Sequence, residues 1–215
     1  MSESLDEMTP IERRSFDRLV NFTDAVVAIA ITLQLLPLVD IKLPKGDVSM
    51  LNLLADNSSQ IIAFILSFVV VAILWVKHNQ VFNILKKSDA VIFWLNIAWM
   101  IGIVFLPWPS AMYGSLSDDQ YVSHLGFGLL YWWTLAAISG IGWLIARYAW
   151  SKPELLEPSA LHDLHHRRRA TNRGASFFFY LLILGLVSEF LPDFLPYLSM
   201  GMIPLSLLMK DKKSN

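Results

Sequence analysis

The polar residues at the start of the first long apolar stretch are the side chains in this sequence with the most evident chemistry. Arg18, Thr23 and Asp24 open a run that is otherwise apolar as far as Leu38. A charged side chain at the centre of a membrane helix costs about 2.5–3.5 kcal/mol on insertion scales, so such residues are candidates for ion contact, proton transfer or interhelical hydrogen bonds. Arg18 and Asp24 point about 240° apart around a helix, so each needs a partner on another element.

A second group of polar and aromatic residues offers such partners. Trp75, His78 and Asn79 have the spacing i, i+3 and i+4 and therefore share one face of a helix. They fall near the end of the second apolar stretch, at the membrane level expected for Asp24. We predict a network between the two helices that contains Arg18, Asp24, Trp75, His78 and Asn79. Structural support is its simplest role; ion contact or gating, and proton sensing by His78, whose ordinary pKa is near 6.5, are the alternatives.

The opposite face of the first helix is apolar except for one hydroxyl group. At about 100° per residue, one stripe faces away from Asp24. Its members are Ala25, Ile29, Thr32, Leu33 and Leu36. A stripe of this kind is more often a packing seam or a lipid-facing surface than the lining of a pore, and periodicity alone leaves all three open.

The elements that must position these residues follow from the composition. Of 215 residues, 55% are apolar and only 16% are charged, whereas soluble domains carry about 25% charged residues. A bilayer core about 30 Å thick needs roughly 20 apolar helical residues. Six stretches qualify, at about 18–38, 59–82, 90–113, 122–148, 173–191 and 194–209. We predict an all-α, polytopic membrane protein in which residues 1–215 form a single six-helix membrane domain.

The distribution of basic residues predicts the orientation. With six spans, all of the 17 Lys and Arg residues except Lys42 and Lys45 fall on the side that holds both termini. Cytoplasmic loops are enriched in Lys and Arg, so we expect both termini in the cytoplasm of a multi-pass protein of the cell membrane, surrounded by its lipids. The same rule explains the cluster Arg167–Arg169, and we expect no nucleic-acid partner.

Several classes of chemistry are disfavoured. The sequence has no cysteine, which excludes disulfides and thiolate-bound metals. No nucleophile motif, phosphate-binding loop or pair of carboxylates suggests an enzyme. We therefore expect no catalytic residue, no cofactor and no resident metal.

The string RLVNFTDAVVAIAITLQLL at 18–36 resembles the signature of the transmembrane-protein-175 family of potassium channels. In that family Arg-x-x-x-Phe-Ser-Asp opens the first helix. Arg18, Phe22, Thr23 and Asp24 match this motif here, with Thr in place of the usual Ser, and the hydroxyl group is kept.

Two further segments are similar to the family. Trp75, His78, Asn79 and Phe82 resemble its polar group behind the pore helix, and LPWPSAMYG at 106–114 resembles its Leu-Pro-Phe-Pro stretch. The resemblance covers the first three predicted spans; the others match by hydropathy alone.

The resemblance implies a potassium-selective channel in which the first helices surround a central axis. The bulky residue five positions after the Asp, here Ile29, would form the constriction, and Leu33 and Leu36 would add apolar rings. Thr32 would supply a layer of hydroxyl oxygens that contact the ion. The sequence has no Thr-Val-Gly-Tyr-Gly loop, so a filter of backbone carbonyls is absent.

The resemblance also implies the oligomer. A single-repeat chain supplies one pore helix, so we expect a homotetramer of the bacterial type, with the polar residues at 18–24 and 75–79 as a supporting network. The alternative is a proton-permeable channel or a proton-coupled transporter that uses Asp24 and His78.

Overall fold

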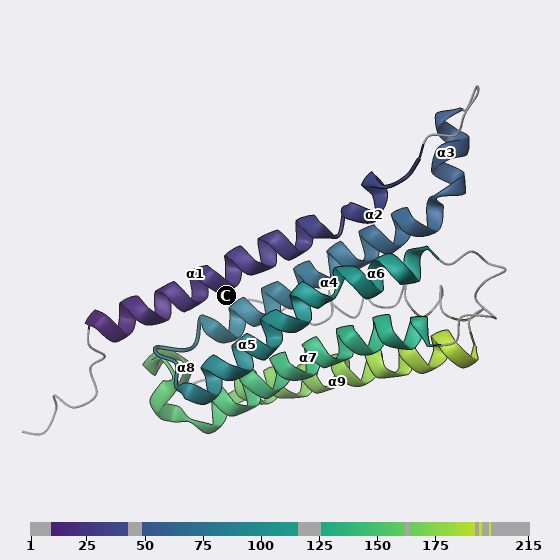
Figure 1. Ribbon diagram of the computed structural model, residues 1–215. Helices are drawn as coiled ribbons and strands as arrows, with labels where there is room; N and C mark the ends of the chain where they lie inside the picture. The colour runs from purple at the N-terminus through teal and green to yellow at the C-terminus, as the bar shows by residue number, and fades with distance from the viewer. Residues whose placement is uncertain are drawn as a thin grey trace, which may run out of the picture.

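Long apolar runs, bounded by proline, serine and glycine, fold into helices that lie along one common axis in the computed structural model (Figure 1). It describes residues 10–42, 49–115, 126–161, 164–191, 194 and 198. Among these residues, four helical segments are long and apolar enough to cross a membrane. These are Pro10–Val39, which comprises α1 (Pro10–Leu33) and α2 (Leu36–Val39), α4 (Ser58–Phe82), Ala90–Gly114, which comprises α5 (Ala90–Phe105) and α6 (Pro107–Gly114), and α7 (Phe127–Ser151).

Four of the six predicted spans correspond to these segments, with shifted ends. The first helix begins at Pro10 instead of Arg18, because the polar residues before the apolar run are also helical. The fourth begins at Phe127, directly after Gly126, whose φ of 98° is readily adopted only by glycine.

The fifth predicted span, 173–191, falls in α9 (Leu164–Phe190), whose apolar part, Gly174–Phe190, is shorter than the four spans above. The sixth, 194–209, lies outside the described residues except for 194 and 198.

In the described part of the chain, short helices lie between the long ones. α3 (Met50–Asp56) precedes α4, and η2 (Pro153–Leu155) and α8 (Pro158–Leu161) follow α7. At that end of the bundle the α4–α5 connection is tied to the α7–α8 connection: the amide of Lys86 donates to the carbonyl of Leu155, and the amide of Glu157 donates to the carbonyl of Ile84, both at 2.9 Å.

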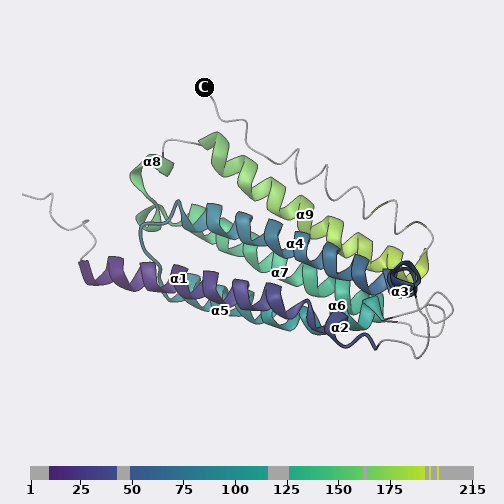
Figure 2. The ribbon, with the colours of Figure 1, turned by 90° about the horizontal axis from the view of Figure 1, so that it is seen from above.

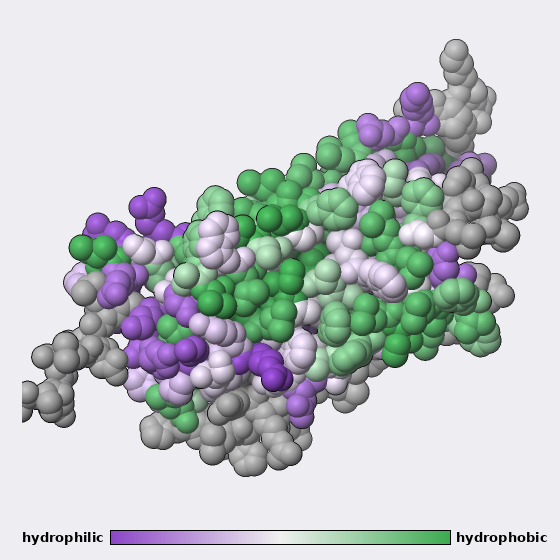
Figure 3. All heavy atoms as spheres, turned by 60° about the horizontal axis from the view of Figure 1, so that its bottom comes forward, coloured by the Kyte–Doolittle hydropathy of each residue, from purple (hydrophilic) through white to green (hydrophobic). Residues whose placement is uncertain are grey.

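The core of the bundle lies between α4, α5, α7 and α9, while α1 packs at its edge against α5 and α4 (Figure 2). Small residues allow the close approaches: a Cβ atom on Gly102 would lie 2.6 Å from Ile138, and one on Gly185 would lie 2.5 Å from Trp133. On the surface, apolar side chains cover the middle of the molecule and polar ones gather toward its ends (Figure 3). This distribution is the one expected for a bundle that spans a bilayer.

Asp89 fixes the start of α5. One carboxylate oxygen accepts the amide of Ile92 at 2.8 Å, as an N-cap does, and the other accepts the hydroxyl of Tyr148 on α7 at 2.6 Å. Partial burial alone would raise the pKa of Asp89, but the hydrogen bonds from Ile92 and Tyr148 outweigh it and hold this pKa below its usual value.

We expect Asp89→Ala to lower the free energy of unfolding by about 0.5–2 kcal/mol through loss of this cap. Because the pKa of Asp89 is lower in the folded protein, its contribution is present above the unfolded pKa near 4 and is lost as pH falls through the folded value. The difference in Tm between the two proteins should therefore shrink below about pH 4. The exposed Asp56→Ala is the control; an equal loss of Tm in both variants would contradict the assignment.

Candidate ion pathway along the first helix

One side of α1 is buried against the bundle. Phe16, Thr23, Val27 and Ala30 are buried, and Gln34, directly after the last turn of α1, continues their line. Their spacing of three, four or seven residues keeps them on one face of the helix. This face meets α4 and α5.

The other side of α1 is free. Ile29 is 60% exposed, Leu36 55% and Leu33 36%, and Ala25 and Thr32 are also exposed. The hydroxyl of Thr32 donates to the carbonyl of Ile29 at 2.7 Å, so the lone pairs of its oxygen remain available on the exposed side. The stripe predicted from periodicity is therefore a solvent- or lipid-accessible surface of the single chain and does not pack within it.

The two sides of α1 differ in their contacts, because its polar side chains form hydrogen bonds on the buried side. Asp24 accepts a hydrogen bond from the indole nitrogen of Trp75 on α4, with 2.8 Å between Nε1 and Oδ1. This is the cross-helix contact that the spacing of the two residues predicted. It joins the middle of α1 to α4.

A second set of hydrogen bonds joins α1, α4 and α5. The amide nitrogen of Asn96 donates to the hydroxyl of Thr23 at 2.8 Å, and that hydroxyl donates to the carbonyl of Leu19 at 2.9 Å. The amide oxygen of Asn96 therefore accepts from His78, at 2.7 Å from Nε2. This order of donors places the proton of His78 on Nε2.

Aromatic rings enclose His78, which is only 4% exposed. Its ring stacks on Phe82 and on Trp99, each with 4.2 Å between centroids. Phe82 stacks in turn on Phe16 of α1. His78 is thus buried behind α1 in mostly aromatic surroundings, and its hydrogen bond to Asn96 links it to the polar contacts of α1.

The structure brings together some of the predicted network and not the rest. Arg18 is exposed and has no ion-pair partner among the described residues, so it takes no part in the contacts described above and its place in the network stays a prediction. The side chain of Asn79 is half-buried and adds no hydrogen bond to the contacts described above. Asn96, which the sequence analysis did not single out, occupies the central position instead; its signal was that it is the one amide in the apolar run 90–105.

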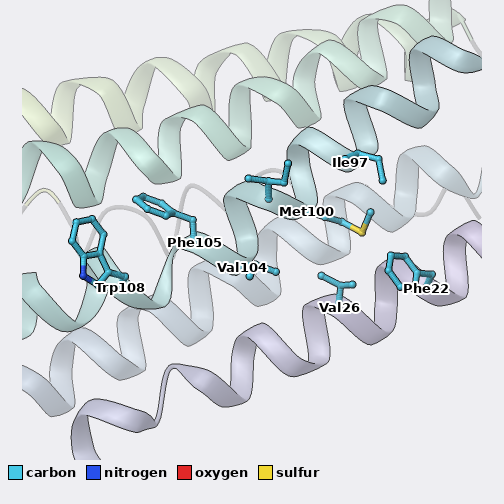
Figure 4. Close-up of a pocket in the computed structure, with 8 residues that line it drawn as sticks. Phe22, Val26, Ile97, Met100, Val104, Phe105 and Trp108 are labelled. Atoms are coloured by element: carbon cyan, nitrogen blue, oxygen red, sulfur yellow. The ribbon is translucent and has the colours of Figure 1, made fainter.

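Phe22 belongs to an apolar groove and not to the polar contacts. The groove, of about 810 Å³, runs between α1 and α5–α6 (Figure 4). Its lining residues are Phe22, Val26, Ile97, Met100, Ile101, Val104, Phe105 and Trp108. The groove opens beside the exposed stripe of α1 and contains no titratable side chain.

The helix is interrupted between α1 and α2, within the exposed stripe. The helix ends at Leu33, and the backbone amide of Leu35 donates to the backbone carbonyl of Thr32, three residues before it, in a turn tighter than that of an α-helix. Pro37 has no N–H group, which removes one hydrogen bond of a continued helix, and α2 begins at Leu36. Leu36 therefore stands beyond the break, and Ile29 and Thr32 before it.

No group of three or more His, Cys, Asp or Glu side chains that could hold a metal occurs in the part of the chain that the structure describes. The side chains of Arg167–Arg169 lie outside the described part.

Comparison with known proteins agrees with this geometry. Residues 18–107 match the family described as "Endosomal/lysosomal potassium channel TMEM175". This segment contains Thr23, Asp24, Trp75, His78 and Asn96, which are the residues that hold α1 in place.

Two curated relatives carry channel names. The chain is 36% identical over 110 residues to a potassium channel of Streptomyces collinus, an alignment that covers 50% of this chain and 52% of that protein. It is 29% identical over 151 residues to the human endosomal/lysosomal proton channel TMEM175, covering 69% of this chain and 28% of that protein. The alignments thus span about half, or less, of the length of these relatives.

The fold has a close counterpart among solved structures. The crystal structure of a lysosomal potassium-selective channel TMEM175 homolog from Chamaesiphon minutus superposes with a TM-score of 0.74 over 92% of this chain and 100% of that chain, at 21% identity. The chain thus shares the fold of this solved structure, and its residues 18–107 are similar to the TMEM175 family.

Proposed function

We propose that this chain forms a potassium-selective channel of the cell membrane, a homotetramer in which α1 of each subunit lines a central pore. Ile29 forms the narrowest apolar ring, Leu33 and Leu36 form further rings, and Thr32 contributes a layer of hydroxyl oxygens. Each subunit crosses the membrane six times, with residues 174–190 of α9 and residues 194–209 as the last two spans, and both termini face the cytoplasm.

The exposed stripe of α1 is the observation that carries this proposal. Polar groups of α1 that need partners, Thr23 and Asp24, are satisfied on the buried side by Asn96 and Trp75. From Ala25 to Leu36 the predicted stripe on the opposite side presents apolar side chains and the lone pairs of Thr32. A helix that is hydrogen-bonded to the bundle on one face and exposes a mostly apolar stripe on the other suits a pore that conducts through a hydrophobic constriction.

The free face also requires more than one copy. One helix cannot enclose a path for an ion, and α1 lies at the edge of the bundle with no other described helix opposite its stripe (Figure 2). Most soluble oligomers are homo-oligomers with closed symmetry, and a closed arrangement of α1 helices around one axis would enclose such a path. The names of the Streptomyces and Chamaesiphon relatives support potassium as the permeating ion.

The second candidate function is proton permeation through Asp24 and His78, which the name of the human relative favours. The geometry offers less support for it. His78 is enclosed by Phe82 and Trp99, and its polar contacts lead through Asn96 to a backbone carbonyl of α1, not to the exposed stripe. Asp24 is joined to Trp75 on the same buried side.

Substitutions of Ile29 test the pore. We expect Ile29→Ala and Ile29→Asn to raise K⁺ flux into proteoliposomes several-fold, because a smaller or polar ring lowers the barrier to wetting. The control is Ile183→Ala on α9, whose side chain is 54% exposed, close to the 60% of Ile29. Unchanged flux in both Ile29 variants would mean that the stripe faces lipid.

Reversal potentials separate the two candidate functions. Under a K⁺ gradient at equal pH, the reversal potential should move toward the K⁺ equilibrium potential; under a pH gradient at equal K⁺, it should stay near zero. A reversal potential that follows the pH gradient and is abolished by Asp24→Asn or His78→Gln would replace the potassium channel by the proton pathway.

The hydrogen bond from Trp75 to Asp24 can be tested separately. Trp75→Phe keeps an aromatic ring but removes the donor to Asp24, so we expect a loss of about 1–3 kcal/mol of stability and a lower K⁺ flux as α1 loses its fixed position. Trp94→Phe, at a side chain that is 66% exposed, is the matched control and should change neither. Equal behaviour of the two variants, measured by Tm and flux, would show that the Trp75–Asp24 contact does not position α1.

A further inference from the structure

A small polar pocket lies behind the break between α1 and α2, on the side of α1 away from the exposed stripe. Three polar side chains from three different elements line it: Gln34 from the break, Gln60 from α4 and Ser110 from α6. Pro37, Ala63 and Gly114 contribute to its walls. None of these residues takes part in the hydrogen bonds that join Thr23 and Asp24 to the bundle.

Gln34 is the unusual member of this group. Its side chain is only 3% exposed, and neither its amide nitrogen nor its amide oxygen has a hydrogen-bond partner among the described residues. The amide oxygen of Gln60 is buried and in the same situation. Buried polar groups in folded proteins are almost always paired, with protein or with ordered water, because an unpaired one is costly. Exchanging the nitrogen and oxygen of Gln34 would not remedy this, since both atoms lack a partner.

Ser110 adds a surplus proton to the pocket. Tyr131 and Ser67 are 2.9 Å apart at their hydroxyl oxygens, and Ser67 and Ser110 are 2.7 Å apart. Either oxygen of each pair could be the donor. Ser67 is the one hydrogen-bond partner of the buried Tyr131 hydroxyl among the described residues. The order in which Tyr131 donates to Ser67 and Ser67 donates to Ser110 therefore leaves no buried proton of Tyr131 or Ser67 unpaired, and we adopt it. The proton of Ser110 is then free to donate, and this residue lines the pocket.

The size of the pocket limits its occupant. The helices approach closely here: a Cβ atom on Gly114 would lie 2.8 Å from that of Ala63, and Ser59 donates to the carbonyl of Gly114 at 3.0 Å. The remaining space is about 10 Å³, which is about the minimum that holds one water molecule.

We propose that one water molecule is bound between Gln34, Gln60 and Ser110 as a fixed part of the fold. It accepts the proton of Ser110 and one from the amide nitrogen of Gln34, and it donates to the amide oxygen of Gln60. These are three hydrogen bonds, the usual number for a buried water, and they satisfy three of the four unmatched groups.

A bare monovalent cation is a poorer occupant. The lining offers at most three side-chain oxygens and no carboxylate. An ion stripped of its hydration shell would carry an uncompensated charge in a buried site. The unmatched donors of Gln34 and Ser110 would also face the cation instead of an acceptor.

The bound water would fix the position of the turn between α1 and α2 relative to α4 and α6. The helical hydrogen bonds of α1 end where Pro37 removes a donor, so the turn needs another connection to the bundle. The water supplies it from Gln34 to α4 and α6, and it thereby fixes where Leu36 stands relative to Ile29.

A structure of the unmodified protein in lipid, at a resolution that shows ordered waters, tests the proposal directly. We expect one density peak within hydrogen-bonding distance of Gln34, Gln60 and Ser110, and no anomalous signal at that position when K⁺ is replaced by Tl⁺. A Tl⁺ signal would assign the site to a cation and overturn the proposal. Direct hydrogen bonds of Gln34 to protein, with no density between the three residues, would overturn it as well.

A double-mutant cycle in Tm tests the same site in solution. Gln34→Leu and Gln60→Leu should each lower Tm by about 2–4 °C, because each leaves the water and the remaining amide incompletely paired. The double variant should lose clearly less than the sum, since both amides are then gone and only the hydroxyl of Ser110 is left to be satisfied. The control cycle pairs Gln34→Leu with Gln80→Leu at an exposed position of α4 and should be additive. Additive losses in both cycles would contradict a shared water.

Neither measurement depends on ion flux. A missing water would leave the proposed channel standing, and a chain that conducts no ion would leave this water site standing.

Discussion

The hydrogen bond from Trp75 to Asp24 is the contact on which the arrangement of α1 depends most. It is 2.8 Å long and joins the least packed long helix of the bundle to α4. Without it a carboxyl group would stand unpaired within an apolar helix, which is costly in a membrane. With it, and with the hydrogen bond from Asn96 to Thr23, the two adjacent polar side chains Thr23 and Asp24 are satisfied on the side that faces the bundle. The other side is thereby left apolar and free.

The remaining elements make this contact possible. Trp75 and His78 are held on α4 because that helix packs against α6 and α7, and Asn96 and Trp99 are held on α5 by α7. The glycines at 102 and 185 allow α5, α7 and α9 to approach closely, which packs the bundle behind α1 tightly. The N-cap at Asp89 and its hydrogen bond to Tyr148 fix where α5 begins, and hence the level at which Asn96 meets Thr23.

The sequence predicts the all-helical class and the pairing of the first two spans because both depend on rare residues in long apolar runs. Asp24 and Trp75 stand out in this way, and their contact is present. Arg18 is exposed and does not share this contact, as expected for a side chain that points about 240° away from Asp24 around the helix. Asn96 was missed because a single amide in an apolar run has no spacing that reveals its partner. The burial of Gln34 depends on where the helix breaks relative to α4 and α6, which no local pattern fixes.

The central claim is that α1 lies on the symmetry axis of a closed assembly. The measurement that tests it most directly is a structure of the intact protein in a lipid bilayer. It should show four subunits around one axis, with the α1 helices nearest to that axis and the side chains of Ile29 facing one another across it. A fourfold assembly with another helix at the axis, or a single chain whose α1 stripe faces lipid, would contradict the account.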